Sequence, residues 1–232
     1  MEYKNSAELC QKMAEKTNGV TLLAFSTGKD ALSAWVELRK YFHTIYPIYY
    51  YMVPGLSFIE RSLKYYEDFF ETKIIRLPNP NLYRMLDAGT FQTKRSWEII
   101  GKYAFTKMNV KREDLCEWVK EDHGIDKGVY TAIGNRMFDN LQRYRSISKF
   151  GAVNHKIKTF FPTYDYKIAD VVRGIKGAGV KLPVDYHIWG KTFDGLDYRF
   201  IKPVKEHFPD DYEKLKSYFP LIDTEIMRYE QL

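Results

Sequence analysis

Cysteine is scarce in this chain, which has only Cys10 and Cys116 among its 232 residues. Two thiols so far apart in the sequence offer neither a disulfide framework nor a metal cluster, and they cannot supply the four thiolates of an iron–sulfur cluster. A long apolar run is also missing, since no stretch approaches the ~20 residues that span a bilayer. These absences predict a protein of the reducing cytoplasm with no membrane segment.

The sequence also lacks internal repeats, low-complexity tracts and long linkers. Its first residues, MEYKNSAELC, do not show the basic and then apolar pattern of a secretory signal. The length fits one domain with a modest appendage. We expect an α/β domain over residues 1–195 and a mixed, mainly helical C-terminal extension over 196–232 that packs on it.

Positive charge is concentrated in one part of the chain. The formal net charge is +6, yet residues 131–181 alone carry ten Lys or Arg and three Asp. Residues 201–232 carry five basic and seven acidic side chains. The basic segment is either a solvated face or a surface for phosphate, sulfate or nucleic acid. No recognisable reading helix or aromatic platform accompanies the charge, so the sequence does not favour nucleic acid.

Strand-like and helix-like segments alternate in the first third of the chain. Residues 20–25 are a short apolar run between turn residues, which predicts a buried strand, and residues 30–42 have apolar positions at helical spacing. A second strand and helix are expected at 45–53 and 58–70, followed by a third strand at 73–77. This alternation predicts an α/β fold with a parallel sheet and helices on both faces.

The remaining elements are less regular. Asn5 and Glu8 form a capping box at the start of an expected helix over 5–18. A further strand is expected at 129–133, and residues 178–204 are expected to be loops with short extended pieces. The other expected helices lie at 80–108 (with breaks), 111–123, 136–147, 166–177 and 210–218.

The most informative stretch is the loop Ser26-Thr27-Gly28-Lys29-Asp30, between the first strand and the helix that follows it. In an open parallel sheet, ligands bind at the carboxyl ends of the strands, and a helix N-terminus there attracts phosphate. Gly28 has no Cβ to keep a phosphate from the backbone, and Lys29 supplies a cation. Asp30 can cap the helix and can also hold a magnesium-bound water. The Walker loop is excluded, because its second glycine and spacing are missing.

This loop resembles the PP-loop of the adenine nucleotide alpha-hydrolase superfamily. It is most similar to the Ser-x-Gly-Lys-Asp-Ser form of the phosphoadenosine phosphosulfate reductase family, which includes the small subunit of ATP sulfurylase. Ala31 departs from that pattern, where the family has Ser, and Ser33 or Thr27 is expected to replace the missing hydroxyl. Further along the chain, Gly134 and Arg136 resemble the family's Gly-x-Arg element after its fourth strand. The resemblance is specific over residues 20–35 and weaker as far as 190.

The resemblance implies a function and a set of site residues. It implies ATP and Mg²⁺ as ligands, with Asp30 as the metal-binding residue and Lys29, Asp30 and Arg136 in the chemistry. The nucleotide contacts that it implies come from Ser26, Thr27, Gly28, Lys29, Asp30, Ser33 and Gly134.

The family's thiol-dependent reduction is not expected, because the chain has no cysteine after Cys116. The other chemistry that the resemblance implies is attack on the α-phosphate of ATP. This reaction adenylylates an acceptor in sulfur metabolism or nucleic-acid modification and releases pyrophosphate. The acceptor is left open between a small anion and a nucleic acid, as is a homodimer or another protein partner. The alternative is a non-catalytic module that binds a nucleotide or nucleic acid to recruit a partner.

Overall fold

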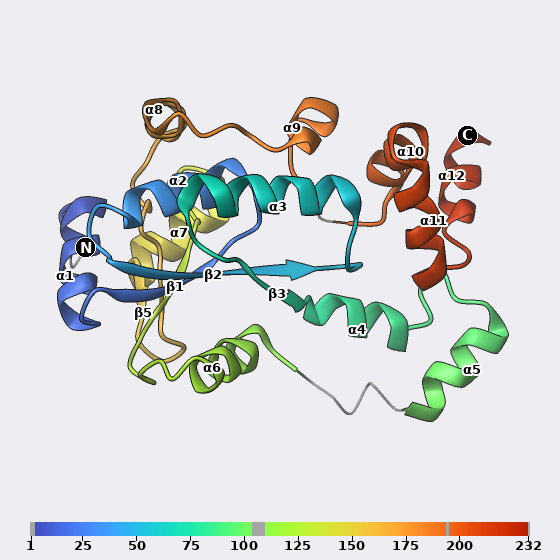
Figure 1. The fold of residues 1–232 in the computed structure, drawn as a ribbon, viewed down its shortest axis with the longest axis horizontal. Coiled ribbons are helices and arrows are strands. Elements are labelled where there is room, and N and C mark those ends of the chain that lie inside the picture. Colours follow the sequence, from blue (N-terminus) through green and yellow to red (C-terminus); the bar gives the residue numbers. More distant parts are fainter. Residues whose placement is uncertain (1–2, 104–109, 194, 232) are drawn as a thin grey trace. The chain divides into compact units, whose positions relative to one another are not determined.

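The computed structural model describes residues 3–103, 110–193 and 195–231. These residues form an α/β protein with a six-stranded, mostly parallel sheet flanked by helices (Figure 1). The expected class and parallel sheet are confirmed at this level. The elements are α1(Ser6–Lys16), β1(Val20–Ala24), α2(Lys29–Leu38), β2(Thr44–Tyr51), α3(Ser57–Phe70), β3(Ile75–Pro78), α4(Pro80–Asp87), α5(Lys94–Tyr103), α6(Arg112–Asp122), β4(Thr131–Ile133), α7(Leu141–Phe150), β5(Val153–Asn154), β6(Thr159–Phe160), α8(Ile168–Ala178), α9(Val184–Trp189), α10(Tyr198–His207), α11(Pro209–Tyr218) and α12(Asp223–Glu230).

The strands follow the order β3-β2-β1-β4-β6-β5 across the sheet. Strand β1 pairs in parallel with both β2 and β4, and β4 pairs in parallel with β6. Strand β5 runs antiparallel to β6 at the end of the order. Strands β1 and β4 are therefore central, and the segments that follow them leave the same edge of the sheet.

The chain divides into two compact units. Unit 1 comprises 1–50, 65–76 and 113–182, and unit 2 comprises 51–64, 77–112 and 183–232. The expected boundary near residue 195 stays a prediction.

The core of unit 1 is aromatic beside β1 and α2. Phe25, directly after β1, lies edge-on to Trp35 of α2 with ring centroids 4.9 Å apart. Trp35 in turn stacks on Phe70 at 4.1 Å, and Phe25 contacts Tyr66 at 5.4 Å. These rings are all buried and anchor the two elements that flank the loop at residues 26–30.

Unit 2 has its own aromatic core and a buried carboxylate. The Phe58 ring lies near those of Trp189, Phe193 and Phe208, at centroid distances of 5.7, 5.7 and 4.8 Å. Asp211 is 2% exposed and accepts hydrogen bonds from the backbone N–H of Ser57 at 2.7 Å and of Phe58 at 3.3 Å. The Ser57 hydroxyl donates to it as well, at 2.8 Å, so this carboxylate caps the start of α3.

Several local expectations are confirmed, and three are corrected. Asn5 caps α1 by accepting from the Glu8 N–H at 2.9 Å, but the Glu8 carboxylate accepts from the Lys4 N–H instead of the Asn5 N–H, so the expected capping box forms only in part. The helix expected from 136 instead begins at Leu141, because Asn140 caps it by accepting from the Arg143 N–H at 2.8 Å.

The segment 178–204 is not extended. It contains α9 and the start of α10, where Gly190 ends one helix and Asp197 caps the next. The short strands β5 and β6 and helix α12 were not expected from the sequence. Residues 104–108 of the expected helical stretch lie outside the described residues. Within the described part of the chain, every helix is too short or too polar to cross a bilayer.

Candidate functional site

The loop at residues 26–30 and the segment after β4 start from neighbouring strands. Strands β1 and β4 are parallel, with Ala24 opposite Ile133 at their ends. The two chain segments therefore leave the sheet side by side at its carboxyl edge, where open α/β sheets bind ligands.

The loop has a strained backbone at Thr27. Its φ is 61°, in the left-handed region that a β-branched residue rarely adopts. The Thr27 hydroxyl donates to the Ser26 carbonyl at 2.6 Å, and the side chain is buried. A strained backbone conformation persists only where the surrounding structure enforces it, and such residues are concentrated at functional sites. Thr27 thus shapes the loop, while Ser26 is exposed on it.

Helix α2 starts without a capping side chain. Gly28 is its N-cap residue and makes no side-chain hydrogen bond. The first N–H groups of a helix lack partners within the helix and lie at the positive end of its dipole. Lys29 and Asp30 follow in the first turn, and their side chains form an ion pair at 2.8 Å. Backbone donors and a cation are thus gathered at one point.

Gly134 brings the segment after β4 against this helix start. A Cβ built on Gly134 meets the Asp30 carbonyl oxygen at 2.7 Å and the Ala31 nitrogen at 2.8 Å. Both neighbours are backbone atoms, which cannot give way as a flexible side chain can. Glycine is therefore required for this close approach, rather than for an unusual φ angle.

Arg136 joins the two segments by charge. Its Nε donates to Asp30 Oδ1 at 2.7 Å, and its side chain is 5% exposed. Its other nitrogens donate to Asp139 and, at 3.3 Å, to the Tyr166 carbonyl oxygen. Asp139 also accepts from Arg143, the third residue of α7. A chain of alternating charges thus runs from Asp30 through Arg136 and Asp139 to Arg143.

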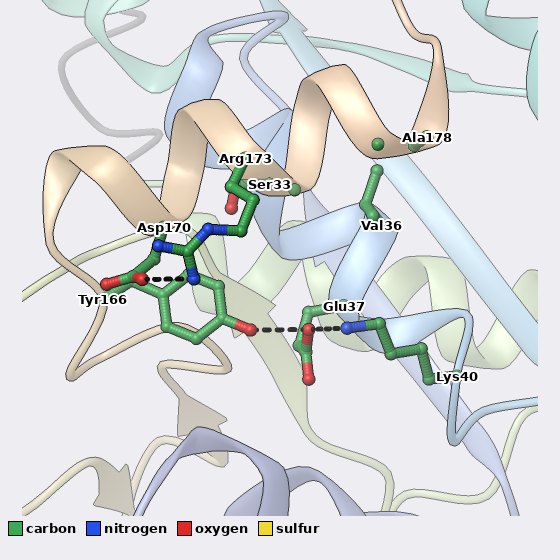
Figure 2. Close-up of a pocket in the computed structure, with 10 residues that line it drawn as sticks. Ser33, Val36, Glu37, Lys40, Tyr166, Asp170, Arg173 and Ala178 are labelled. Carbon is green, nitrogen blue, oxygen red and sulfur yellow. Dashed lines mark hydrogen bonds and ion pairs between the residues drawn. The ribbon is translucent and has the colours of Figure 1, made fainter.

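Ser33 lies one turn further along α2 and faces a different place. Its side chain is buried, and its hydroxyl has no hydrogen-bond partner among the described residues. It lines a cavity of about 520 Å³ between α2 and α8, shown in Figure 2. A Cβ built on Gly174 of α8 lies 4.0 Å from the Ser33 hydroxyl oxygen, so the two helices pack closely at this point.

The same cavity holds a buried carboxylate that the sequence analysis did not single out. Glu37 accepts from the Tyr166 hydroxyl and from Lys40 Nζ, both at 2.6 Å (Figure 2). Burial, and then the hydrogen bond to Glu37, raise the pKa of the Tyr166 phenol, which therefore stays protonated as a donor. The available sequence signal was a single charged residue, Glu37, in the otherwise uncharged stretch of residues 31–38.

The two cysteines lie in the interior of the protein. Both are free and buried, and burial strongly raises the pKa of the Cys10 thiol. Across the ranges that the structure describes, no group of three or more His, Cys, Asp or Glu side chains could hold a metal ion. A magnesium ion held by one carboxylate and by phosphate oxygens does not require such a group.

The structure thus brings Gly28, Lys29, Asp30, Gly134 and Arg136 together, and it places Ser33 on the α2–α8 cavity. Neither the protein-family models nor the curated proteins compared with this chain give a match.

Proposed function

We propose that this protein binds ATP with its phosphates on residues 26–30, in the manner of the PP-loop proteins and with their adenine nucleotide alpha-hydrolase fold. The observation that carries the proposal is the start of α2. A helix without a side-chain cap begins at the carboxyl edge of a central strand, and a strained turn precedes it. Such a helix start binds anions through its N–H groups and its dipole.

The charges around the loop suit a phosphate chain. Lys29 is 31% exposed and is paired with Asp30 at the surface, so its ammonium can turn to a phosphate at small cost. Asp30 is the residue that would hold Mg²⁺ through a bound water, and the ion supplies charge neutralisation at the phosphate oxygens. Arg136 is buried between two carboxylates, which suits a positioning residue that orients Asp30.

The reaction that we propose is adenylyl transfer in the cytoplasm. An acceptor oxygen or nitrogen attacks the α-phosphorus of ATP, and the bond from that phosphorus to the oxygen bridging the α- and β-phosphates breaks. Pyrophosphate leaves with the electron pair of that bond, and the acceptor carries the adenylyl group. Backbone N–H groups and Lys29 stabilise the charge that develops on the phosphate oxygens. The buried, neutral thiol of Cys10 is consistent with chemistry that uses no thiolate.

Ala31 supports a second candidate function. It is 4% exposed in the first turn of α2 and supplies no hydroxyl where the family has one. A protein that binds the nucleotide without turning it over, and so recruits a partner, is the alternative that this residue favours.

Pyrophosphate release tests the reaction. The parent protein is incubated with ATP and Mg²⁺ and with sulfate, small carboxylic acids or single-stranded RNA as acceptors. We expect pyrophosphate with one acceptor class and a loss of about 10- to 1000-fold in Asp30→Asn, because the carboxylate near the phosphates is gone. Asp122→Asn on α6, a carboxylate 56% exposed, is the matched control and should keep full activity.

Circular dichroism of Asp30→Asn checks that the fold is intact. Release of orthophosphate in place of pyrophosphate would rule out adenylyl transfer. Nucleotide binding without turnover for any acceptor would support the recruiting module.

A further inference from the structure

Helix α7 leaves most of its apolar side chains uncovered. Of its ten residues, all of them described, Ile147 alone is buried. Leu141 is 62% exposed and Tyr144 is 46% exposed. Phe138, just before the helix, is 48% exposed, with its ring centroid 6.3 Å from that of Tyr144. A helix normally buries its apolar stripe against its own domain, so these outward rings need an explanation.

The same helix is basic throughout. It contains Arg143, Arg145 and Lys149 and no acidic residue. Arg145 and Lys149 are exposed, and neither forms an ion pair with a carboxylate of the described residues. Leu141, Arg145 and Lys149 recur at intervals of four residues on the face of the helix away from Ile147, and the exposed ring of Tyr144 lies on the adjoining side. Two cations and a flat ring are therefore exposed together on α7.

Helix α7 is connected to the candidate site through Arg143. Arg143 pairs with Asp139, which also holds Arg136, and Arg136 pairs with Asp30 of the loop. The segment from the loop to α7 is thus held together by contiguous ion pairs. A partner bound on α7 therefore contacts a helix that is tied by ion pairs to the loop where we propose that ATP binds.

We propose that Phe138, Leu141, Tyr144, Arg145 and Lys149 form a binding surface for single-stranded nucleic acid, called here the α7 surface. The inference rests on the proposed function in one respect: it takes single-stranded nucleic acid to be the acceptor of the proposed adenylyl transfer. Proteins that bind single strands combine cations along the backbone with aromatic rings on which unstacked bases lie. Both are present here, and the surplus of basic side chains over residues 131–181 adds to the attraction for phosphate. A duplex would offer these rings no free base face.

The test is fluorescence anisotropy with labelled U20 and dT20 strands and a matching duplex, each at two salt concentrations. The parent protein should bind either single strand more tightly than the duplex, with affinity falling steeply as salt rises. Tyr144→Ala should weaken single-strand binding about 5- to 100-fold through the lost stacking. Combined Arg145→Ala and Lys149→Ala should lower the magnitude of the log–log salt slope by about 1.4, or about 0.7 per phosphate contact.

Two matched control variants distinguish binding at the α7 surface from nonspecific effects of any exposed aromatic ring or cation. Trp118→Ala on α6 removes an aromatic ring that is 50% exposed, and Lys127→Ala, outside residues 131–181, removes a cation whose side chain is 72% exposed. Neither should change strand binding by more than twofold. Equal losses in the controls, an absence of binding at low salt, or binding to anionic vesicles or an acidic peptide in place of the strands would overturn the proposal.

A parallel titration with ATP separates this inference from the proposed function. Tyr144→Ala should bind ATP as the parent does, because its ring lies outside residues 26–30. Strand binding by a protein that does not bind ATP would support the α7 surface and contradict the nucleotide site. ATP binding by a protein that does not bind the strands would support the nucleotide site and contradict the α7 surface.

Discussion

Two helices of this protein begin in opposite ways. The start of α3 in unit 2 is closed by a buried carboxylate, since Asp211 accepts from two backbone N–H groups and from the Ser57 hydroxyl. The start of α2 in unit 1 has Gly28 as its N-cap residue, with no side-chain hydrogen bond. Instead, a cation and a strained residue surround it. A fixed carboxylate stabilises one helix, whereas the other helix start is arranged for an anion that comes from outside.

The largest expected effect is on the capped helix. Asp211→Ala leaves the buried Phe58 N–H and the part-buried N–H and hydroxyl of Ser57 without their acceptor, and should lower the free energy of unfolding by about 2–4 kcal/mol. Asp210→Ala, an exposed neighbour in the same turn of α11, is the control and should cost less than about 0.5 kcal/mol. Urea denaturation followed by circular dichroism gives both values. The comparison fails if the two variants have equal free energies of unfolding. It also fails if Asp211→Ala lowers the free energy of ATP binding by as much as it lowers the free energy of unfolding.

A smaller effect on stability, joined to a loss of binding, is expected at the uncapped helix. Gly134→Ala places a methyl group against backbone atoms of Asp30 and Ala31. The start of α2 must then shift, at a cost of about 1–3 kcal/mol, and ATP affinity should fall about tenfold or more. Gly177→Ala, at a helix position with open space around the new methyl group, should instead be neutral or slightly stabilising. An unchanged ATP affinity in Gly134→Ala would show that the close approach to α2 has no part in binding.

Local patterns were enough to predict the elements around the loop. The apolar run of β1, the turn residues after it and the helical spacing of α2 each favour one structure, and the observed bounds agree within a few residues. Where proline and glycine could mark either a loop or the ends of a helix, the prediction was wrong. Residues 178–204 were expected to be loops with short extended pieces, yet Pro183 and Gly190 flank the short helix α9 there.

The contacts that define the site could be predicted only in part. The parallel order of β1 and β4 makes it reasonable that Gly134 and Arg136 lie near the loop, but the ion pair of Arg136 with Asp30 depends on tertiary packing. The exposure of α7 was missed for a similar reason. Its apolar residues recur at helical spacing, and spacing identifies a stripe without revealing what covers it.

The central claim is that a nucleotide phosphate binds at the uncapped start of α2, and calorimetric titration of Mg²⁺-ATP tests it most directly. Lys29→Ala removes a charge-assisted contact to phosphate and should weaken binding by about 1.5–3 kcal/mol, or roughly 10- to 150-fold. Lys176→Ala, which removes an exposed cation from α8, is the matched control and should bind ATP as the parent does. Equal ATP affinity in the parent protein and in Lys29→Ala would contradict the account.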